Sequence, residues 1–159
     1  MANVFQANPV FRMDVTANNG ATYWCIEELS FYDSFGTRLT VDRARATAQS
    51  QYSIQYGPSM AFNEESDGDA SYYCSQYGIT TGWLQYVFSS SVVVASYKVE
   101  RLNDHGDQYS PVAWAMKLST DGGNTWMTVD DQSGQTGWGD GEVRTFTIST
   151  SQASLQCTK

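Results

Sequence analysis

Hydrophobic and polar residues alternate with a period of two along several short stretches of the chain. Successive side chains of a β-strand point to opposite faces, so this pattern predicts strands with one buried face. The stretches are rich in β-branched and aromatic residues, and Gly, Asn, Asp and Ser separate them. We expect strands at residues 11–16, 28–32, 83–88, 93–99, 112–118, 126–129 and 143–148.

No stretch of the chain sustains the 3.6-residue period of a helix. Many short strands joined by turn residues are typical of an antiparallel β-sandwich or jelly roll. The sequence has no internal repeat and no linker, so we expect one all-β domain over residues 1–159.

One turn has a sharper signature. Residues 119–126 read STDGGNTW, which fits the Asp-box pattern S-x-D-x-G-x-T-W. Asp121 can accept hydrogen bonds from amides of the turn, and Gly122 and Gly123 allow positive φ. We interpret the box as a hairpin lock, with Trp126 capping the hairpin. The box occurs once, whereas sialidase propellers carry one per blade, so a propeller is excluded.

Composition narrows the possible functions. Hydrophobic residues make up 41% of the chain and aromatic residues 14%, which excludes a disordered protein. The net charge is −8, and the basic residues form no cluster, which argues against nucleic acid as a partner. No apolar run approaches the ~18 residues that a membrane span needs, so no membrane insertion is expected.

The N-terminal residues lack the basic and apolar segments of a signal peptide. We therefore expect synthesis in the host cytoplasm without export. The three cysteines, Cys25, Cys74 and Cys157, form no CxxC pair. Because disulfides are rare in the reducing cytoplasm, the sequence predicts three buried free thiols rather than a disulfide framework. Their spacing also argues against zinc.

Five segments occur in an order that is informative as a set: CIEELSFYD, AF…DGD…SYY, GWLQYVF, PVAWAMKLSTDGGNTW and GEVRTFTI. Together they resemble the factor V/VIII type C (discoidin) family, which includes family 32 carbohydrate-binding modules. The likeness covers about residues 10–149. It implies a non-enzymatic, galactose-binding-like jelly roll that presents the loops of one end to glycans, lipids or proteins.

An acidic segment falls on the D-G-N/D loop of that family, which in many members binds a structural Ca²⁺. The resemblance makes Asp67 and Asp69 candidate metal ligands, and carboxylate oxygens suit this cation. Residues 63–66 are inserted before this loop, and Cys74 stands where the family has Trp. A solvated acidic loop is the alternative.

The resemblance also indicates a sugar site, although Ser75 stands at the family's His position. An Arg–Asn pair and an aromatic platform are the family's other elements, and a flat ring can stack on a sugar. The candidate ligand-binding residues are Arg101, Asn103, Asp104, His105, Tyr109 and Trp138. An ordinary polar loop at the rim of the sandwich is the alternative.

An enzyme is not expected, because the single histidine, His105, has no nucleophile motif to accompany it. We expect a recognition and structural subunit of a virion, in a bacteriophage tail or head decoration, that presents rim loops to host-surface glycans. Its partners would be other virion subunits. Two alternatives stay open: a purely structural subunit without a sugar site, and a free-standing Ca²⁺-dependent lectin.

Overall fold

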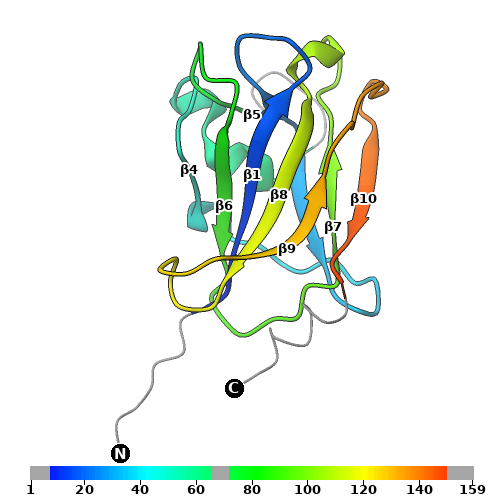
Figure 1. Cartoon of the computed structure of the whole chain (residues 1–159). Helices are drawn as coiled ribbons and strands as arrows, with labels where there is room; N and C mark the ends of the chain where they lie inside the picture. Colours follow the sequence, from blue (N-terminus) through cyan, green and yellow to red (C-terminus); the bar gives the residue numbers. More distant parts are fainter. Residues whose placement is uncertain (1–7, 66–71, 150–159) are drawn as a thin grey trace, which may run out of the picture.

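The computed structural model describes residues 8–65 and 72–149 (Figure 1). In these ranges the strands are β1 (Val10–Asn18), β2 (Cys25–Ile26), β3 (Glu28–Tyr32), β4 (Ala46–Ala48), β5 (Tyr73–Cys74), β6 (Gly82–Val87), β7 (Ser96–Glu100), β8 (Pro111–Ser119), β9 (Met127–Gln132) and β10 (Val143–Thr147). The helices are short 3₁₀ turns: η1 (Arg43–Arg45), η2 (Ile54–Tyr56), η3 (Pro58–Phe62) and η4 (Asp107–Tyr109). The predicted all-β class is confirmed. None of the described helices has the length and apolarity to cross a membrane.

The strands pair antiparallel in three sheets. A five-stranded sheet has the order β4-β6-β1-β8-β9, a three-stranded sheet has the order β10-β7-β3, and β2 pairs with β5. This arrangement confirms the predicted antiparallel sandwich. Strands β2, β4 and β5 were not predicted, because two or three residues are too few to show a period.

The core lies between the two larger sheets. Inward positions alternate along each strand as the sequence pattern requires, and each apolar side chain of this size contributes about 1.5–3 kcal/mol on full burial. The side chains that the larger strands contribute to the core are Phe11, Met13, Val15, Leu29, Phe31, Leu84, Tyr86, Tyr97, Val99, Trp114, Met116, Leu118, Val129 and Phe146.

The expected strand at residues 93–99 is partly wrong. Strand β7 begins only at Ser96. Before it, Val94 is buried whereas Val93 and Ala95 are partly exposed, the reverse of the predicted face. The physical reason is that residues 91–95 form an irregular segment, which changes the phase of the side chains before the strand starts.

The Asp-box forms the hairpin lock that the sequence predicted between β8 and β9. Asp121 accepts hydrogen bonds from the Thr125 backbone amide at 2.9 Å and from the Thr125 hydroxyl at 2.5 Å. The Gly123 amide donates to the Ser119 hydroxyl at 2.8 Å, with Gly123 at a φ of 92°. The Thr125 hydrogen bonds lower the pKa of Asp121 to about 2, so this carboxylate stays ionised.

Glu28 is a buried acid in the three-stranded sheet. Its Oε1 lies 2.7 Å from Nη2 of Arg38, and its Oε2 has no hydrogen-bond partner among the described residues. Burial raises the pKa of Glu28 to about 8, although the charge of Arg38 opposes the shift. Glu100, its partner across β3 and β7, adds to the shift.

This shift predicts a pH-dependent stability. The folded protein binds more protons than the unfolded chain between the ordinary glutamate pKa of 4.5 and the folded value of about 8. The free energy of unfolding should therefore fall as pH rises through this window. Urea unfolding at both ends of the window should show the fall, and Glu28→Gln should reduce it. The same pH dependence in both proteins would contradict the assignment to Glu28.

Candidate functional site

The loops that follow β1, β5, β7 and β9 lie at one end of the sandwich, at the top of Figure 1. We call this the loop end. The turn after β3 lies at the opposite end, where residues 33–38 are drawn in cyan. The β2–β5 pair lies near the loop end and organises the candidate site.

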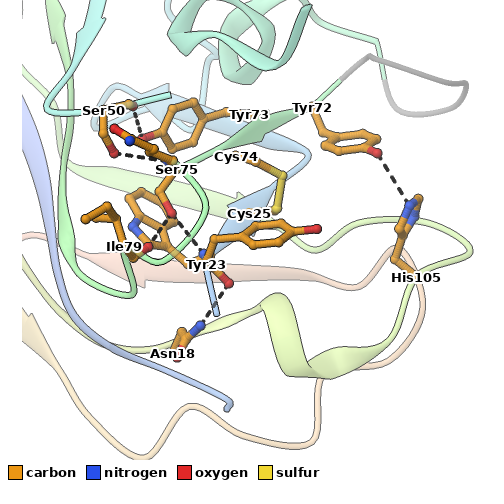
Figure 2. Close-up of a disulfide and its surroundings, with 12 residues drawn as sticks. Asn18, Tyr23, Cys25, Ser50, Tyr72, Tyr73, Cys74, Ser75, Ile79 and His105 are labelled. Carbon is orange, nitrogen blue, oxygen red and sulfur yellow. Dashed lines mark hydrogen bonds between the residues drawn. A yellow bond between two sulfur atoms is a disulfide. The ribbon is translucent and has the colours of Figure 1, made fainter. Parts of the chain in front are cut away.

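A disulfide joins Cys25 of β2 to Cys74 of β5 (Figure 2). The two residues are direct partners in the antiparallel pair, with their Cα atoms 4.2 Å apart. The prediction of three free thiols is therefore wrong for these two, and Cys157 lies outside the described residues. The pairing joins positions 49 residues apart, and this proximity arises only from the folded topology.

Side chain–backbone hydrogen bonds hold the segments on either side of the disulfide (Figure 2). The Ser75 hydroxyl accepts from the Trp24 amide at 3.0 Å and donates to the Ile79 carbonyl at 2.6 Å. The Asn18 side-chain amide donates to the carbonyl of Tyr23 at 2.9 Å. Ser75, at the expected histidine position of a sugar site, is thus a buried structural residue here.

Around the disulfide, tyrosine side chains gather from several loops. Tyr23 is central: its ring centroid lies 5.0 Å from that of Tyr109, 5.2 Å from Tyr52 and 6.1 Å from Tyr77. The chain of contacts continues from Tyr52 to Tyr56 at 6.0 Å and from Tyr56 to Tyr72 at 5.0 Å. We define the tyrosine cluster as Tyr23, Tyr52, Tyr56, Tyr72, Tyr77 and Tyr109.

Much of the tyrosine cluster faces solvent. Tyr52 is 48% exposed and Tyr77 is 66% exposed, and the apolar side chains of Ile54 and Ile79 are exposed in the neighbouring segments. Large exposed apolar side chains gathered in one region mark interaction surfaces. The predicted site included Tyr109 of this cluster but none of its other five tyrosines, although the density of tyrosine between residues 52 and 77 was a signal for them.

Two adjoining hollows open within the tyrosine cluster. The larger hollow has a volume of about 150 Å³ and is lined by Tyr23, Tyr52, Tyr56, Tyr72 and Cys74. The smaller hollow, of about 50 Å³, shares Tyr23, Tyr72 and Cys74 with the larger one, so the disulfide and two rings form their common boundary. The other described residues that line the smaller hollow are Cys25, Leu102, His105 and Tyr109.

Tyr23 keeps its proton at any physiological pH. Burial raises the pKa of Tyr23 to about 12, and a hydrogen bond with Tyr109 adds to the shift. The ring therefore presents an uncharged π-face, with a hydroxyl that can still hydrogen-bond.

The side chain of the predicted Arg101 makes its contacts inside the fold, with its own loop and with Asp140 of the loop after β9. The side chain is 6% exposed, its Nη1 lies 3.0 Å from Oδ1 of Asp140, and its Nη2 donates to the His105 carbonyl. The amide of Asp104 also donates to Asp140, at 2.8 Å. The structure thus assigns Arg101 a role in shaping the loop that contains Asn103 and Asp104.

Of the other predicted residues, Tyr109 belongs to the tyrosine cluster and His105 lies beside it. His105 and Tyr109 both line the smaller hollow. His105 Nε2 lies 3.4 Å from the Tyr72 hydroxyl (Figure 2). His105 Nδ1 lies 2.7 Å from the Asn103 carbonyl. Their place at the loop end agrees with the expected position, and their binding role stays a prediction.

The prediction that Trp138 is an exposed platform is wrong. The side chain is only 4% exposed and belongs to the core. Its Nε1 donates to the Gln135 carbonyl at 2.8 Å, and the guanidinium of Arg144 lies 4.0 Å above its ring. The polar edge of the indole is satisfied inside the fold, so its apolar ring can be buried. A sugar has no free face of this ring to stack on.

The candidate metal ligands Asp67 and Asp69 lie outside the described residues. Within residues 8–65 and 72–149, no group of three or more His, Cys, Asp or Glu side chains could hold a metal ion. The proposed Ca²⁺ therefore stays a prediction for this chain.

Comparisons with protein-family models, with curated protein sequences and with solved structures give no significant match. The resemblance to the discoidin family thus stays a prediction that rests on its motifs.

Proposed function

We propose that this protein is a non-enzymatic recognition module that binds surface glycans through its tyrosine cluster. The observation that carries the proposal is the cluster itself, with its partly exposed rings around two hollows at the loop end. A tyrosine ring offers an apolar face for a sugar ring and a hydroxyl for its polar groups, at a low cost in side-chain entropy. In this proposal the tyrosine rings serve as the aromatic platform that was predicted for Trp138.

We further propose the setting in which the module acts. The order of the sequence motifs supports a galactose-binding-like jelly roll, displayed in a bacteriophage tail or head decoration together with other virion subunits. Many copies on one particle would make a weak glycan site effective through avidity. This setting rests on analogy of fold and motif.

A second candidate function is a protein contact without a sugar site. The high exposure of Ile54 and Tyr77 favours it, because exposed apolar side chains also mark subunit interfaces. The two functions use the same surface, so one experiment has to distinguish them.

The test replaces the two most exposed rings of the cluster, Tyr52 and Tyr77, with alanine. Glycan-array binding should fall by roughly tenfold or more, since each of the two aromatic contacts contributes about 0.5–1.5 kcal/mol. The matched control is Phe35→Ala: Phe35 is 91% exposed and lies in the turn at the opposite end. Both proteins should keep the melting temperature of the wild type.

A wild-type level of glycan binding in the double variant would contradict the proposal. So would the absence of any bound glycan for the wild type. In the second case, association with partner subunits that is lost only in the double variant would support the protein-contact function.

A further inference from the structure

The larger hollow is lined mainly by the aromatic rings of tyrosine, as far as its described residues show. Of the described residues that line it, four are tyrosines and the other is Cys74 of the disulfide. The ring planes of Tyr52 and Tyr56 are nearly perpendicular, at 83°, and their centroids lie 6.0 Å apart. The ring of Tyr23 contacts that of Tyr52, and the ring of Tyr72 contacts that of Tyr56. A group in this hollow would meet ring surfaces from several directions.

The charges around the larger hollow favour a positive guest. The face of an aromatic ring carries negative quadrupolar potential, which attracts a cation within about 6 Å of the ring centroid. No Lys or Arg is among the described residues that line this hollow. The basic side chain of the neighbouring loop, Arg101, is already paired with Asp140. The whole chain carries a charge of −8, which adds a long-range attraction for cations.

The chemistry of the lining also distinguishes between cations. A primary ammonium group has three N–H donors and needs acceptors such as carboxylates when it leaves water. In the described part of the chain, none of the residues that line the larger hollow carries a carboxylate. A quaternary ammonium has no N–H donors, and methyl groups cover its charge, so ring faces alone can replace its hydration.

We propose that the larger hollow binds a quaternary ammonium group, such as the trimethylammonium of choline. The inference rests on the proposed function only in placing ligand binding at the loop end. A glycan that carries choline would engage both features, with the sugar on the exposed rings and the ammonium in the hollow. The smaller hollow, with His105 at its edge, would then receive the polar part next to the ammonium.

The test compares choline with 3,3-dimethylbutan-1-ol, a neutral molecule of the same shape. Both are titrated into the full chain and followed by calorimetry and by NMR of the tyrosine rings. Choline should bind with a Kd of about 1 mM or lower, and the neutral analogue at least about tenfold more weakly. Tetramethylammonium should bind, and ammonium should not. Equal binding of choline and its neutral analogue, or no binding of either, would overturn the inference.

Variants locate the site. Tyr56→Leu removes one ring face and should weaken choline binding at least tenfold, whereas Tyr56→Phe keeps the face and should change the affinity by less than about threefold. Tyr52→Leu is a second variant at a more exposed position, for use if Tyr56→Leu lowers the melting temperature. Phe35→Ala should leave the affinity unchanged. Choline affinity unchanged in both leucine variants would also overturn the inference.

The outcomes separate this inference from the proposed function. Glycan binding that depends on Tyr52 and Tyr77, without any preference for choline over its neutral analogue, would uphold the function and reject the ammonium site. Choline binding without any glycan on the array would uphold the ammonium site and reject the glycan part of the function.

Discussion

The Trp138→Ala variant should unfold with a free energy about 3–5 kcal/mol lower than that of the wild type, as is usual when a buried tryptophan is truncated. The large effect is expected because the indole is buried in the core, donates to the Gln135 carbonyl and packs beneath Arg144. Its removal leaves a cavity and takes the indole donor away from the Gln135 carbonyl. Urea denaturation followed by far-ultraviolet circular dichroism measures the change.

Two control variants are compared with Trp138→Ala. Trp138→Phe keeps an aromatic ring under Arg144 and should cost less than the alanine variant. Tyr77→Ala removes an aromatic side chain that is 66% exposed and should change the stability by less than about 0.5 kcal/mol. If Trp138→Ala were as stable as the wild type and had lost only glycan binding, Trp138 would be a surface platform after all.

Loss of the Cys25–Cys74 disulfide should lower the free energy of unfolding by about 4 kcal/mol. This magnitude follows from the 49-residue separation of the two cysteines, because a cross-link of this span removes entropy from the unfolded chain. The Cys25→Ala, Cys74→Ala double variant, or the wild type under reducing conditions, should show the loss in urea denaturation. Loss of the disulfide should also weaken ligand binding, since Cys74 lines both hollows.

Thiol titration under denaturing, non-reducing conditions provides an independent check. With two of the three cysteines in the disulfide, one thiol per chain should react. A count of three would show that the disulfide is absent in the purified protein. The Cys157→Ser variant is the matched control and should keep the sensitivity of the wild type to reductant, since it retains both cysteines of the disulfide.

The sequence by itself determined the fold class and the longer strands. In β1 and β8 the alternation of apolar and polar residues matches the buried and exposed faces of the strands, because side-chain direction in a strand has a fixed period of two. The Asp-box hairpin was predictable for a similar reason. Its hydrogen bonds join residues within a few positions of one another, so local spacing alone describes them.

The candidate site was only partly predictable. The loop that contains His105 and Tyr109 was identified, and it does line a hollow at the loop end. Arg101 was predicted to be a ligand residue, but its charge is paired with Asp140 of the loop after β9. The type of a residue shows which interactions its side chain can make. Whether another residue of the protein already makes those interactions with it is known only from the fold.

Tertiary structure alone decided the remaining features. The disulfide, the burial of Trp138 and the assembly of the tyrosine cluster each depend on segments that are distant in sequence. Tyr23 meets Tyr52 and Tyr109 because the β2–β5 pair and the loop after β7 converge at one end of the sandwich. Local periodicity reports which face of a strand is apolar, but it carries no information on which distant loops share an end. The hollows of the tyrosine cluster therefore exist only in the folded chain.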